Sequence, residues 1–504
     1  MPIGFNSIPG NIRAPIIAFE VNSGGQFESV SRLLLIGHKN TDADLVDSVP
    51  ARCNSDVEAI AIAGKGSMLA EMMIAARRNA PAQDIWLLST PAVGVAEVRT
   101  ITVGTLPAAG GTGMLTVAGE PIALTMGAGD TAAAVATALA AAINGYQNAL
   151  TRSALPFTAT SATNVVTLTA RHAGAIANDI DVFIPTLTTG NAFTSVLTLA
   201  TTTAGTGEPD TSAALAAMGD DPFDWIVSPF GDDANMDRYR SVLSDVSGRW
   251  AWNRQSYGHV YTQRSGTTAV LTTFGLSFDT RHITVLPRLT GGTDGATPWA
   301  YVAAVAARVT PWLSDGALGN VSRNQTGLVV EGVVAPRDRT KWVNDYASRD
   351  SFIGSGLSTL TVRSDGQVAI DKLVTMQRTD GAGNVDTTFR DLQKIGQLMY
   401  ALRRFRARLQ AEHGQKAIAD SNPGDLLAIT TAQDIKATMI ATAAEMAGVL
   451  ENIGEFAQRL DLRRNADNPN RVDIYAPLDM INPLDVIAAN ATIYSQYRAF
   501  SAAA

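Results

Sequence analysis

Short apolar runs alternate with helical stretches along most of this chain, and that alternation limits the folds it can adopt. An apolar run at 32–36 ends at Gly37, a stretch rich in Ala and Met follows at 66–79, and a second apolar run occupies 85–88. The alternation returns after residue 210, with strand candidates at 225–227, 258–261 and 282–286 and helical candidates at 211–219, 235–250, 267–275 and 299–313. Strands separated by helices predict an α/β (or α+β) core, in which a mixed sheet is flanked by helices.

A different composition sets residues 92–209 apart from this core. Thr, Ala and Gly dominate there, and charged residues are scarce. Gly119 can turn a hairpin, and Thr131 can cap an alanine-rich helix that runs through Ile143. The strand candidates lie at 98–103, 114–117, 122–125, 165–170 and 180–184. We predict an inserted, β-rich outer domain with one helix.

The last third of the chain returns to mixed patterns. It offers strands at 360–363, 369–375 and 472–477, long helices at 391–412 and 431–459, and a final strand at 491–498. The predicted parts are an N-terminal arm at 1–26, the core at 27–91, the inserted domain at 92–209, the second part of the core at 210–478 and a C-terminal arm at 479–504.

Both ends of the chain have the pattern of extended arms. Residues 1–26 hold three prolines and four glycines, with a patch of β-formers at 12–21. A terminal strand such as 491–498 leaves backbone groups and an apolar face unpaired unless the edge of another sheet accepts it. That edge belongs either to a neighbouring copy or, in a hairpin, to the strand at 472–477 of the same chain.

The composition of the chain limits the kinds of partner that it is expected to bind. Hydrophobic residues make up 46% of the chain and charged residues 17%, and the net charge is −8. This acidic balance does not favour nucleic acid as the main partner. The apolar runs are too short or too interrupted for direct membrane insertion, and the N-terminus lacks the pattern of a signal peptide. The single cysteine, Cys53, excludes an internal disulfide and favours assembly inside a reducing cell.

No motif predicts catalysis, a cofactor or a metal. The segment 64–67 resembles a phosphate-binding loop, but Ala59 replaces its first glycine and Gly66 stands where Ser or Thr is required. Three aspartates within 42–47 lack the glycine turn and the terminal glutamate of a calcium loop, so we predict a solvated acidic loop. The histidines are scattered singly, at His38, His172, His259, His282 and His413. The sequence therefore predicts no enzyme.

Four arginines form the densest basic group of the chain: Arg403, Arg404, Arg406 and Arg408. In the predicted helix, the period of 3.6 residues places Arg404 and Arg408 on one side and the apolar residues on another. Two interpretations remain open. The basic stripe is either a solvated face paired with nearby acids or a contact with an acidic partner surface.

Several segments resemble the tail sheath proteins of Mu-like bacteriophages. The similarity is strongest after about residue 325, at 373–400, 402–404 and 470–484. The opening at 8–15 is similar to the start of that family, and 129–133 and 168–174 resemble the module inserted in these sheaths. The similarity spans nearly the whole chain.

This resemblance implies a structural virion protein of a contractile injection system. Six copies would form a ring, and rings would stack helically around a rigid inner tube and contract to drive it through the target envelope. The implied partners are further copies of the chain, the inner tail tube protein, and baseplate and tail terminator proteins. Assembly would take place in the host bacterial cytoplasm. The alternatives are an α/β enzyme with an unrecognised active site and another tail or baseplate protein.

The resemblance also implies that both arms complete sheets in neighbouring subunits. The residues predicted to lie in these arm strands are Ile12, Ile16, Ile17, Phe19, Val21, Ala491, Ile493, Tyr494 and Tyr497. The basic stripe at 403–408 is predicted to face the inner tube, because cationic side chains suit an acidic tube wall.

Overall fold

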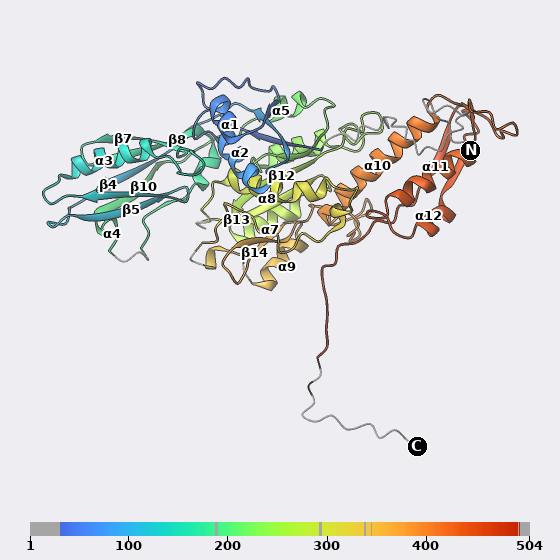
Figure 1. The fold of residues 1–504 in the computed structure, drawn as a ribbon. Helices are drawn as coiled ribbons and strands as arrows, with labels where there is room; N and C mark the ends of the chain where they lie inside the picture. Colours follow the sequence, from blue (N-terminus) through green and yellow to red (C-terminus); the bar gives the residue numbers. More distant parts are fainter. Residues whose placement is uncertain are drawn as a thin grey trace, which may run out of the picture. The chain divides into compact units, whose positions relative to one another are not determined.

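The computed structural model describes residues 31–186, 190–291, 295–336, 339–343, 345–491 and 493. A six-stranded sheet in the order β13-β12-β11-β1-β3-β2 forms its core (Figure 1). The strands are β1 (Arg32–Gly37), β2 (Ala51–Cys53), β3 (Asp84–Ser89), β11 (Phe223–Val227), β12 (His259–Gly266) and β13 (Ile283–Leu289). All neighbours are parallel except β2, which is antiparallel to β3. The predicted mixed sheet is confirmed.

Helices cover this sheet, as the alternation predicted. The helices of the core are α1 (Asp56–Ala63), α2 (Met68–Asn79), α5 (Ser212–Ala217), α6 (Asp233–Val242), α7 (Thr268–Ser277) and α8 (Pro298–Leu313). α2 and α8 pack against each other and against the central strands. β1 and β11 are buried almost throughout, which is typical of parallel strands covered on both faces.

Residues 96–203 build two further sheets that share no strand with the core sheet. Their orders are β10-β4-β8-β7 and β6-β5-β9. The elements are β4 (Ala96–Val103), β5 (Gly111–Val117), β6 (Glu120–Met126), α3 (Ala132–Gly145), β7 (Phe157–Ala162), β8 (Val165–Ala173), η1 (Ala175–Asp179), β9 (Val182–Phe183), α4 (Phe193–Val196) and β10 (Leu197–Thr203). The predicted hairpin is confirmed, because β5 pairs with β6 around Ala118 and Gly119, both at positive φ.

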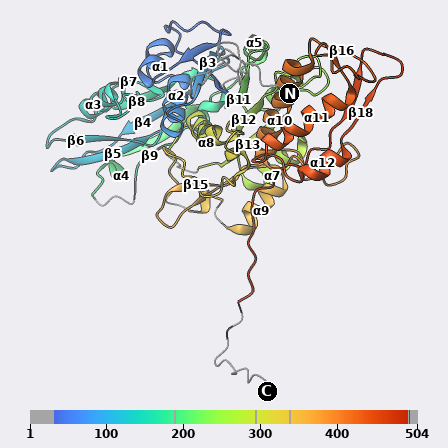
Figure 2. The same ribbon diagram turned by 45° about the vertical axis from the view of Figure 1, so that its right-hand side comes forward.

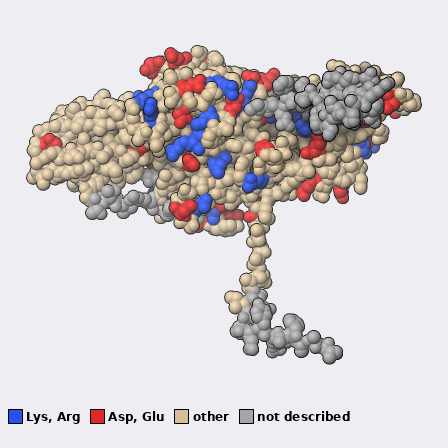
Figure 3. Space-filling model, viewed as in Figure 1, with Lys and Arg blue, Asp and Glu red and all other residues tan. Residues whose placement is uncertain are grey.

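The surface over these sheets carries few charges (Figure 3). Within 96–203 the charged residues are Glu97, Arg99, Glu120, Asp130, Arg152, Arg171, Asp179 and Asp181. Exposed positions on the edge strands β7 and β10 are mostly Thr, Ser or Ala. These side chains keep the edges polar without adding charge.

The C-terminal third packs a long helix against the core and against a small lobe (Figure 2). Its elements are η2 (Asn320–Ser322), η3 (Arg339–Lys341), α9 (Tyr346–Gly354), β14 (Thr359–Val362), β15 (Val368–Lys372), α10 (Leu392–His413), β16 (Ala417–Ile418), β17 (Ile429–Thr430), α11 (Ala432–Glu445), α12 (Ile453–Arg459), β18 (Asp461–Arg464) and β19 (Val472–Tyr475). β14–β15 and β18–β19 are antiparallel pairs, and β16–β17 is a parallel pair. We call the part from β16 to β19 the C-terminal lobe.

Two predicted helices are wrong in their extent. The helix predicted over 235–250 ends at Val242, because the Ser244 hydroxyl accepts a hydrogen bond from the amide of Val246 at 3.1 Å and turns the chain. The amide of Arg249 then donates back to the carbonyl of Val242 at 2.7 Å. This turn replaces the last two predicted helical turns.

The helix predicted over 431–459 is broken into α11 and α12. Gly448 lies against Gly319, so closely that a Cβ atom on Gly448 would meet the Gly319 Cα at 2.7 Å. Asn452 then adopts a left-handed conformation with φ of 53°, which an α-helix does not tolerate. α1 and β2 had no counterpart in the sequence prediction. In the part of the chain that is described, no helix has both the length and the apolar character needed to cross a membrane.

Candidate functional site

The sheet order points to one place where a ligand would be expected. In chain order the parallel strands are β1, β3, β11, β12 and β13, and in space β1 lies between β3 and β11. Open α/β sheets of this topology bind ligands at the carboxyl ends of the strands, where the order reverses. Here that place is the crevice between β1 and β11.

Side chains of this protein fill the crevice. His38 follows β1 and Phe230 follows β11, and their ring centroids are 5.0 Å apart. His172 enters from β8, with its ring centroid 5.5 Å from that of His38. All three side chains are buried. The ligand position of the α/β fold is therefore occupied by protein.

The loop that resembles a phosphate site is occupied in the same way. Its helix, α2, begins at Met68, whose amide donates to His172 Nε2 at 3.1 Å. The amide of Leu69 donates to the His38 carbonyl at 3.1 Å, and that of Ala70 donates to the Ser67 hydroxyl at 3.2 Å. Phosphate binding at a helix N-terminus needs these amides. In this structure each of the three already has an acceptor.

The buried histidines are held neutral. Burial lowers the pKa of His38 to about 4 and the pKa values of His172 and His259 to about 3. His259 Nε2 lies 2.9 Å from the hydroxyl of Thr284, inside the sheet. Burial also lowers the pKa of His282, although Asp245 opposes the shift. Among the described residues no three His, Cys, Asp or Glu side chains gather in a way that could hold a metal ion.

Glu71 joins α2 to the start of α8. Its carboxylate accepts hydrogen bonds from Trp299 Nε1 at 2.6 Å and from the Thr297 hydroxyl at 3.1 Å. Burial raises its pKa to about 8, although these two hydrogen bonds and Arg171 act in the opposite direction. Glu71 lines a cleft together with residues of the loop around Asn148. The carboxyl group ties α2 to the start of α8.

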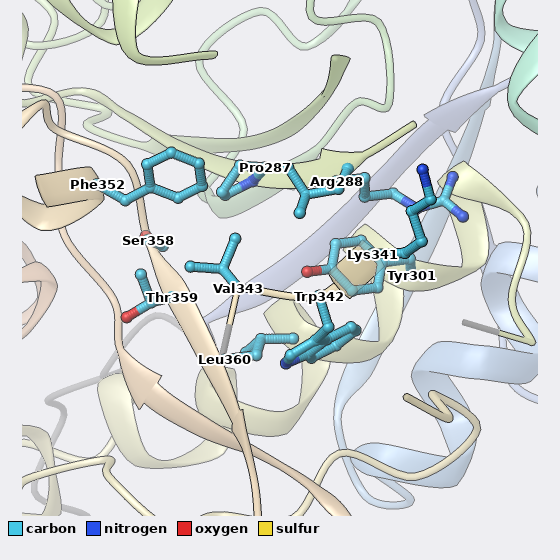
Figure 4. Close-up of a pocket in the computed structure, with 11 residues that line it drawn as sticks. Pro287, Arg288, Tyr301, Lys341, Trp342, Val343, Phe352, Ser358, Thr359 and Leu360 are labelled. Atoms are coloured by element: carbon cyan, nitrogen blue, oxygen red, sulfur yellow. The ribbon is translucent and has the colours of Figure 1, made fainter. Parts of the chain in front are cut away.

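A pocket beside β13 is lined mainly by apolar side chains (Figure 4). Val343 points between Phe352 and Trp342, with Leu360 below. The Trp342 Nε1 group is buried and has no hydrogen-bond partner among the described residues. Most of the lining suits packing, and Arg288, Tyr301 and Lys341 lie together at one end of the pocket (Figure 4).

Cys53 and the aspartates at 42–47 also have structural surroundings. Cys53 is buried, and that burial raises the pKa of its thiol to about 11. Asp47 accepts a hydrogen bond from the Ser89 hydroxyl at 2.5 Å. A thiol with a raised pKa is a poor nucleophile, so neither feature marks a reactive site.

The structure divides the predicted basic stripe. Arg403 makes a two-point ion pair with Asp224 on β11, at 2.6 and 2.5 Å. Arg404 pairs with Glu445 at 3.0 Å and Arg408 pairs with Glu412 at 2.6 Å. Arg406 is exposed and has no ion-pair partner among the described residues. Three of the four arginines therefore have acids within their own subunit, and the position of the stripe relative to a tube stays a prediction.

The predicted arm residues are described only in part. Ala491 and Ile493 lie outside any strand, and the Ile493 side chain is 92% exposed. The other predicted arm residues lie outside the described residues: Ile12, Ile16, Ile17, Phe19, Val21, Tyr494 and Tyr497.

The C-terminal lobe contains a surface that the sequence reasoning did not single out. β18 and β19 form a sheet of two strands, and neither strand has a second neighbour among the described residues. Tyr475 on β19 is 66% exposed. A two-stranded sheet with open edges can accept a further strand. The alternating pattern at 472–477 predicted the strand, and its position as an open edge depends on the fold.

Comparison with known proteins finds similarity to phage tail sheath proteins. Residues 204–376 match the family model for the phage tail sheath protein central domain. Over 503 residues, 97% of this chain and 99% of the relative, the chain is 27% identical to the Mu-like prophage FluMu tail sheath protein of Haemophilus influenzae. The fold is similar to the sheath tail protein of Desulfitobacterium hafniense, with a TM-score of 0.49, 14% identity and coverage of 93% of this chain and 97% of that one. For the sheath tail protein of Listeria innocua the TM-score is 0.47, the identity 14% and the coverage 90% and 92%.

A mixed α/β core that carries the central domain of phage tail sheaths defines a structural tail component. The resemblance of the chain to the tail sheath proteins of Mu-like bacteriophages is confirmed, and its residues 204–376 match the central domain of phage tail sheath proteins.

Proposed function

We propose that this protein is the non-enzymatic subunit of a contractile sheath. Six copies form a ring, and the rings stack helically around the inner tube and contract to drive it through the envelope of a target cell. Its partners are other copies of itself, the inner tail tube protein, and baseplate and tail terminator proteins. It is assembled in the host bacterial cytoplasm and resides in the virion.

The observation that carries the proposal is the apolar C-terminal segment. Lys372 pairs with Asp485 at 2.5 Å and holds the base of this segment on the core. Beyond that ion pair the apolar side chains are open to solvent, with Val486 75%, Ile487 81% and Ile493 92% exposed. Exposed apolar side chains gathered on one segment mark a surface that a partner covers. A neighbouring copy supplies that partner in a sheath.

The open hairpin of the C-terminal lobe is the best supported acceptor for an arm. A sheet of only two strands is marginally stable by itself, so added strands would stabilise it. Each added ladder hydrogen bond contributes roughly 0.5–1.5 kcal/mol. A handful of such bonds, together with the burial of Ile493, would link subunits strongly enough to persist while the cores move.

Electron microscopy of the purified protein tests the proposal directly. Rings, tubes or polysheaths of uniform diameter are expected at moderate protein concentration. A monodisperse monomer under every condition of salt and concentration would contradict it and would favour the alternative of an α/β enzyme.

We expect the inserted domain to be dispensable for assembly. Deletion of residues 92–209 with a short linker should leave ring formation intact, because the two chain crossings are adjacent. The amide of Val95 lies 2.9 Å from the carbonyl of Thr206, so a short linker can bridge the gap. The thermal midpoint should fall, because the Met68 amide loses its acceptor, His172. Microscopy and thermal melting measure the two effects.

The deletion prediction has one decisive contrary outcome. A deletion variant that is soluble and folded but forms neither rings nor tubes would show that the inserted domain takes part in the lattice. Circular dichroism establishes folding before assembly is scored.

Arg406 is the arginine of the stripe best placed to contact a tube. The change Arg406→Glu should release more inner tube from assembled particles, and the release from the unchanged protein should increase as salt rises. A rim contact of this kind contributes about 0.2–1 kcal/mol, and the effect accumulates over many subunits. Sedimentation of particles after salt washes measures tube retention. Arg152→Glu, at an exposed position after α3, is the matched control. Equal release from both variants would count against a tube-facing stripe.

A further inference from the structure

Hydrogen bonds join the inserted domain to the core at two places, and Gly119 also packs against Gly295. The first is a neck, where Val95 and Thr206 exchange both backbone hydrogen bonds at 2.9 and 3.0 Å. The second lies at the start of α2, where His172 accepts the hydrogen bond from the Met68 amide. The neck is covalent and closed by backbone groups, whereas the hydrogen bond at the second place depends on a side chain that can change its charge.

The backbone fits closely around this second attachment. Gly66, just before α2, has φ of +71°, and a Cβ atom there would lie 2.9 Å from the Leu155 carbonyl of the inserted domain. The same carbonyl accepts a hydrogen bond from Arg171 Nε at 2.8 Å. Gly66 of the core and Leu155 and Arg171 of the inserted domain therefore form this contact together. The contact positions His172 at the N-terminus of α2.

The hydrogen bond fixes the state of His172. Nε2 accepts from a backbone amide, so it must carry a lone pair, and the ring must be neutral with its proton on Nδ1. Protonation would remove the acceptor and place an imidazolium against the N-terminus of α2. That end of a helix carries a partial positive charge, which repels a cation.

Protonation of His38 is unfavourable in the same way as protonation of His172. Its Nδ1 lies 2.7 Å from the Thr90 carbonyl, so Nδ1 carries the proton. Its Nε2 is buried without a hydrogen-bond partner among the described residues. A second proton on this ring would be buried without an acceptor, 5.5 Å from the ring of His172.

We propose that His172, together with His38, is an acid-sensitive latch that holds the inserted domain on the core. At neutral pH the latch is closed by the hydrogen bond to Met68. As the pH falls, the domain separates from the end of α2 and stays connected through its neck. The proposal concerns a device within one subunit and does not depend on the sheath function.

The other charged groups around the latch do not reverse this direction. Arg171 lies next to His172 and lowers its pKa, while Asp47 raises that of His38. Burial outweighs Asp47, because the pKa of His38 is still lowered to about 4. Lys65, in the loop before α2, adds a further positive charge in the sequence next to the helix start. Glu71, one turn along α2, interacts with Arg171.

The sign of the pH dependence follows from these shifts. An accessible histidine has a pKa near 6.5, and in the closed latch both values are well below that. Below about pH 6.5 the open form therefore binds more protons than the closed form. The closed form loses stability as the pH falls, by about tenfold in the opening equilibrium for each pH unit and each histidine.

Hydrogen exchange of the full chain, followed by mass spectrometry, tests the latch. The observable is the protection of peptides covering residues 66–74 and 168–174, corrected for the intrinsic pH dependence of exchange. Between pH 6.5 and 4.5 protection should fall by about tenfold to a hundredfold per pH unit. A peptide from 392–401 on α10 serves as the internal reference and should change little over this range.

Two conservative variants decide the outcome. His172→Gln keeps an acceptor for the Met68 amide, and His38→Asn keeps a donor for the Thr90 carbonyl, but neither titrates. Protection at pH 7 should match that of the unchanged protein. As the pH falls, each variant should lose about tenfold less protection per pH unit than the unchanged protein. His413→Gln, at the end of α10, is the control that should keep the full slope. Equal slopes in the unchanged protein and in both variants would overturn the proposal.

Discussion

Removal of residues 491–504 should leave a folded, soluble monomer that no longer forms rings or sheaths. Among the removed residues the structure describes Ala491 and Ile493, and Ile493 is 92% exposed. No burial of that side chain in its own subunit is lost. The free energy of unfolding should therefore change by no more than about 0.5 kcal/mol. Polymerisation should fail, because the link made by the C-terminal arm loses its strand. Thermal melting and negative-stain microscopy measure the two properties.

A shorter truncation separates the strand from the extreme end. Removal of residues 499–504 leaves the predicted arm strand at 491–498 intact, so assembly should persist. The single change Ile493→Asp should behave like the long truncation, because it introduces a charge into the face that a partner must cover. These two variants show whether the strand itself, and not chain length, makes the link.

The contrary outcome belongs to the alternative in which the last strand folds back within its own subunit. In that case the long truncation would lower the thermal midpoint of the monomer, while any folded protein would still assemble. The described part of the segment does not favour this alternative. Ala491 and Ile493 lie in no strand, and the described partner of β19 is β18.

The core could be predicted from the sequence because its signals are local. The run ending at Gly37 became β1, and the Ala- and Met-rich stretch became α2 with Ser67 as its cap. The hairpin at Gly119 could be predicted because alternating strand patterns flank a glycine, which accepts the positive φ of a tight turn. Periodicity and turn chemistry act over a few residues, so they can be read without knowledge of the fold.

The errors come from contacts between residues far apart in the chain. The break between α11 and α12 depends on Gly448 lying against Gly319, and the sequence around residue 448 does not indicate this contact. The early end of α6 likewise depends on a turn at Ser244 that competes with the helix. Tertiary packing overrode helix propensity at both places.

The candidate sites show the same limit. The spacing of the arginines on α10 predicted a stripe. The acid that pairs with Arg403 is Asp224 on β11, which lies far from α10 in the sequence. His172 was noted only as a scattered histidine, because its acceptor role depends on α2, which precedes it by about a hundred residues. The exposed apolar segment after Asp485 was the part of the interaction surface that composition could indicate.

The change Arg403→Ala should cost about 3–5 kcal/mol of stability, which is the usual cost of leaving a buried charge without its partner. Arg403 projects from α10, and Asp224 lies on β11 with a side chain that is 4% exposed. Two short hydrogen bonds join the guanidinium to the carboxylate, and the centre of the Tyr257 ring lies 5.4 Å from the guanidinium carbon. Without Arg403 the carboxylate would remain buried in the sheet.

The effect should extend beyond stability, because α10 leads from the core into the C-terminal lobe. The half of α10 near Ile395 is buried in the core, and its last turns contact α11. Arg403 lies between these two regions and fixes the helix on the sheet. If the arms of neighbouring copies pair with the lobe, a loosened α10 should also reduce assembly, in proportion to the loss of stability.

A double-mutant cycle distinguishes the ion pair from simple packing. Arg403→Met with Asp224→Leu removes both charges while keeping apolar volume, and it should recover most of the stability that either single change loses. Arg406→Ala, three residues along the same helix, is exposed and should change the free energy of unfolding by less than about 0.5 kcal/mol. Urea unfolding of the monomer truncated after residue 490 gives the four values without interference from assembly. A loss below about 1 kcal/mol for Arg403→Ala, or single changes that simply add in the double variant, would show that the pair does not anchor α10.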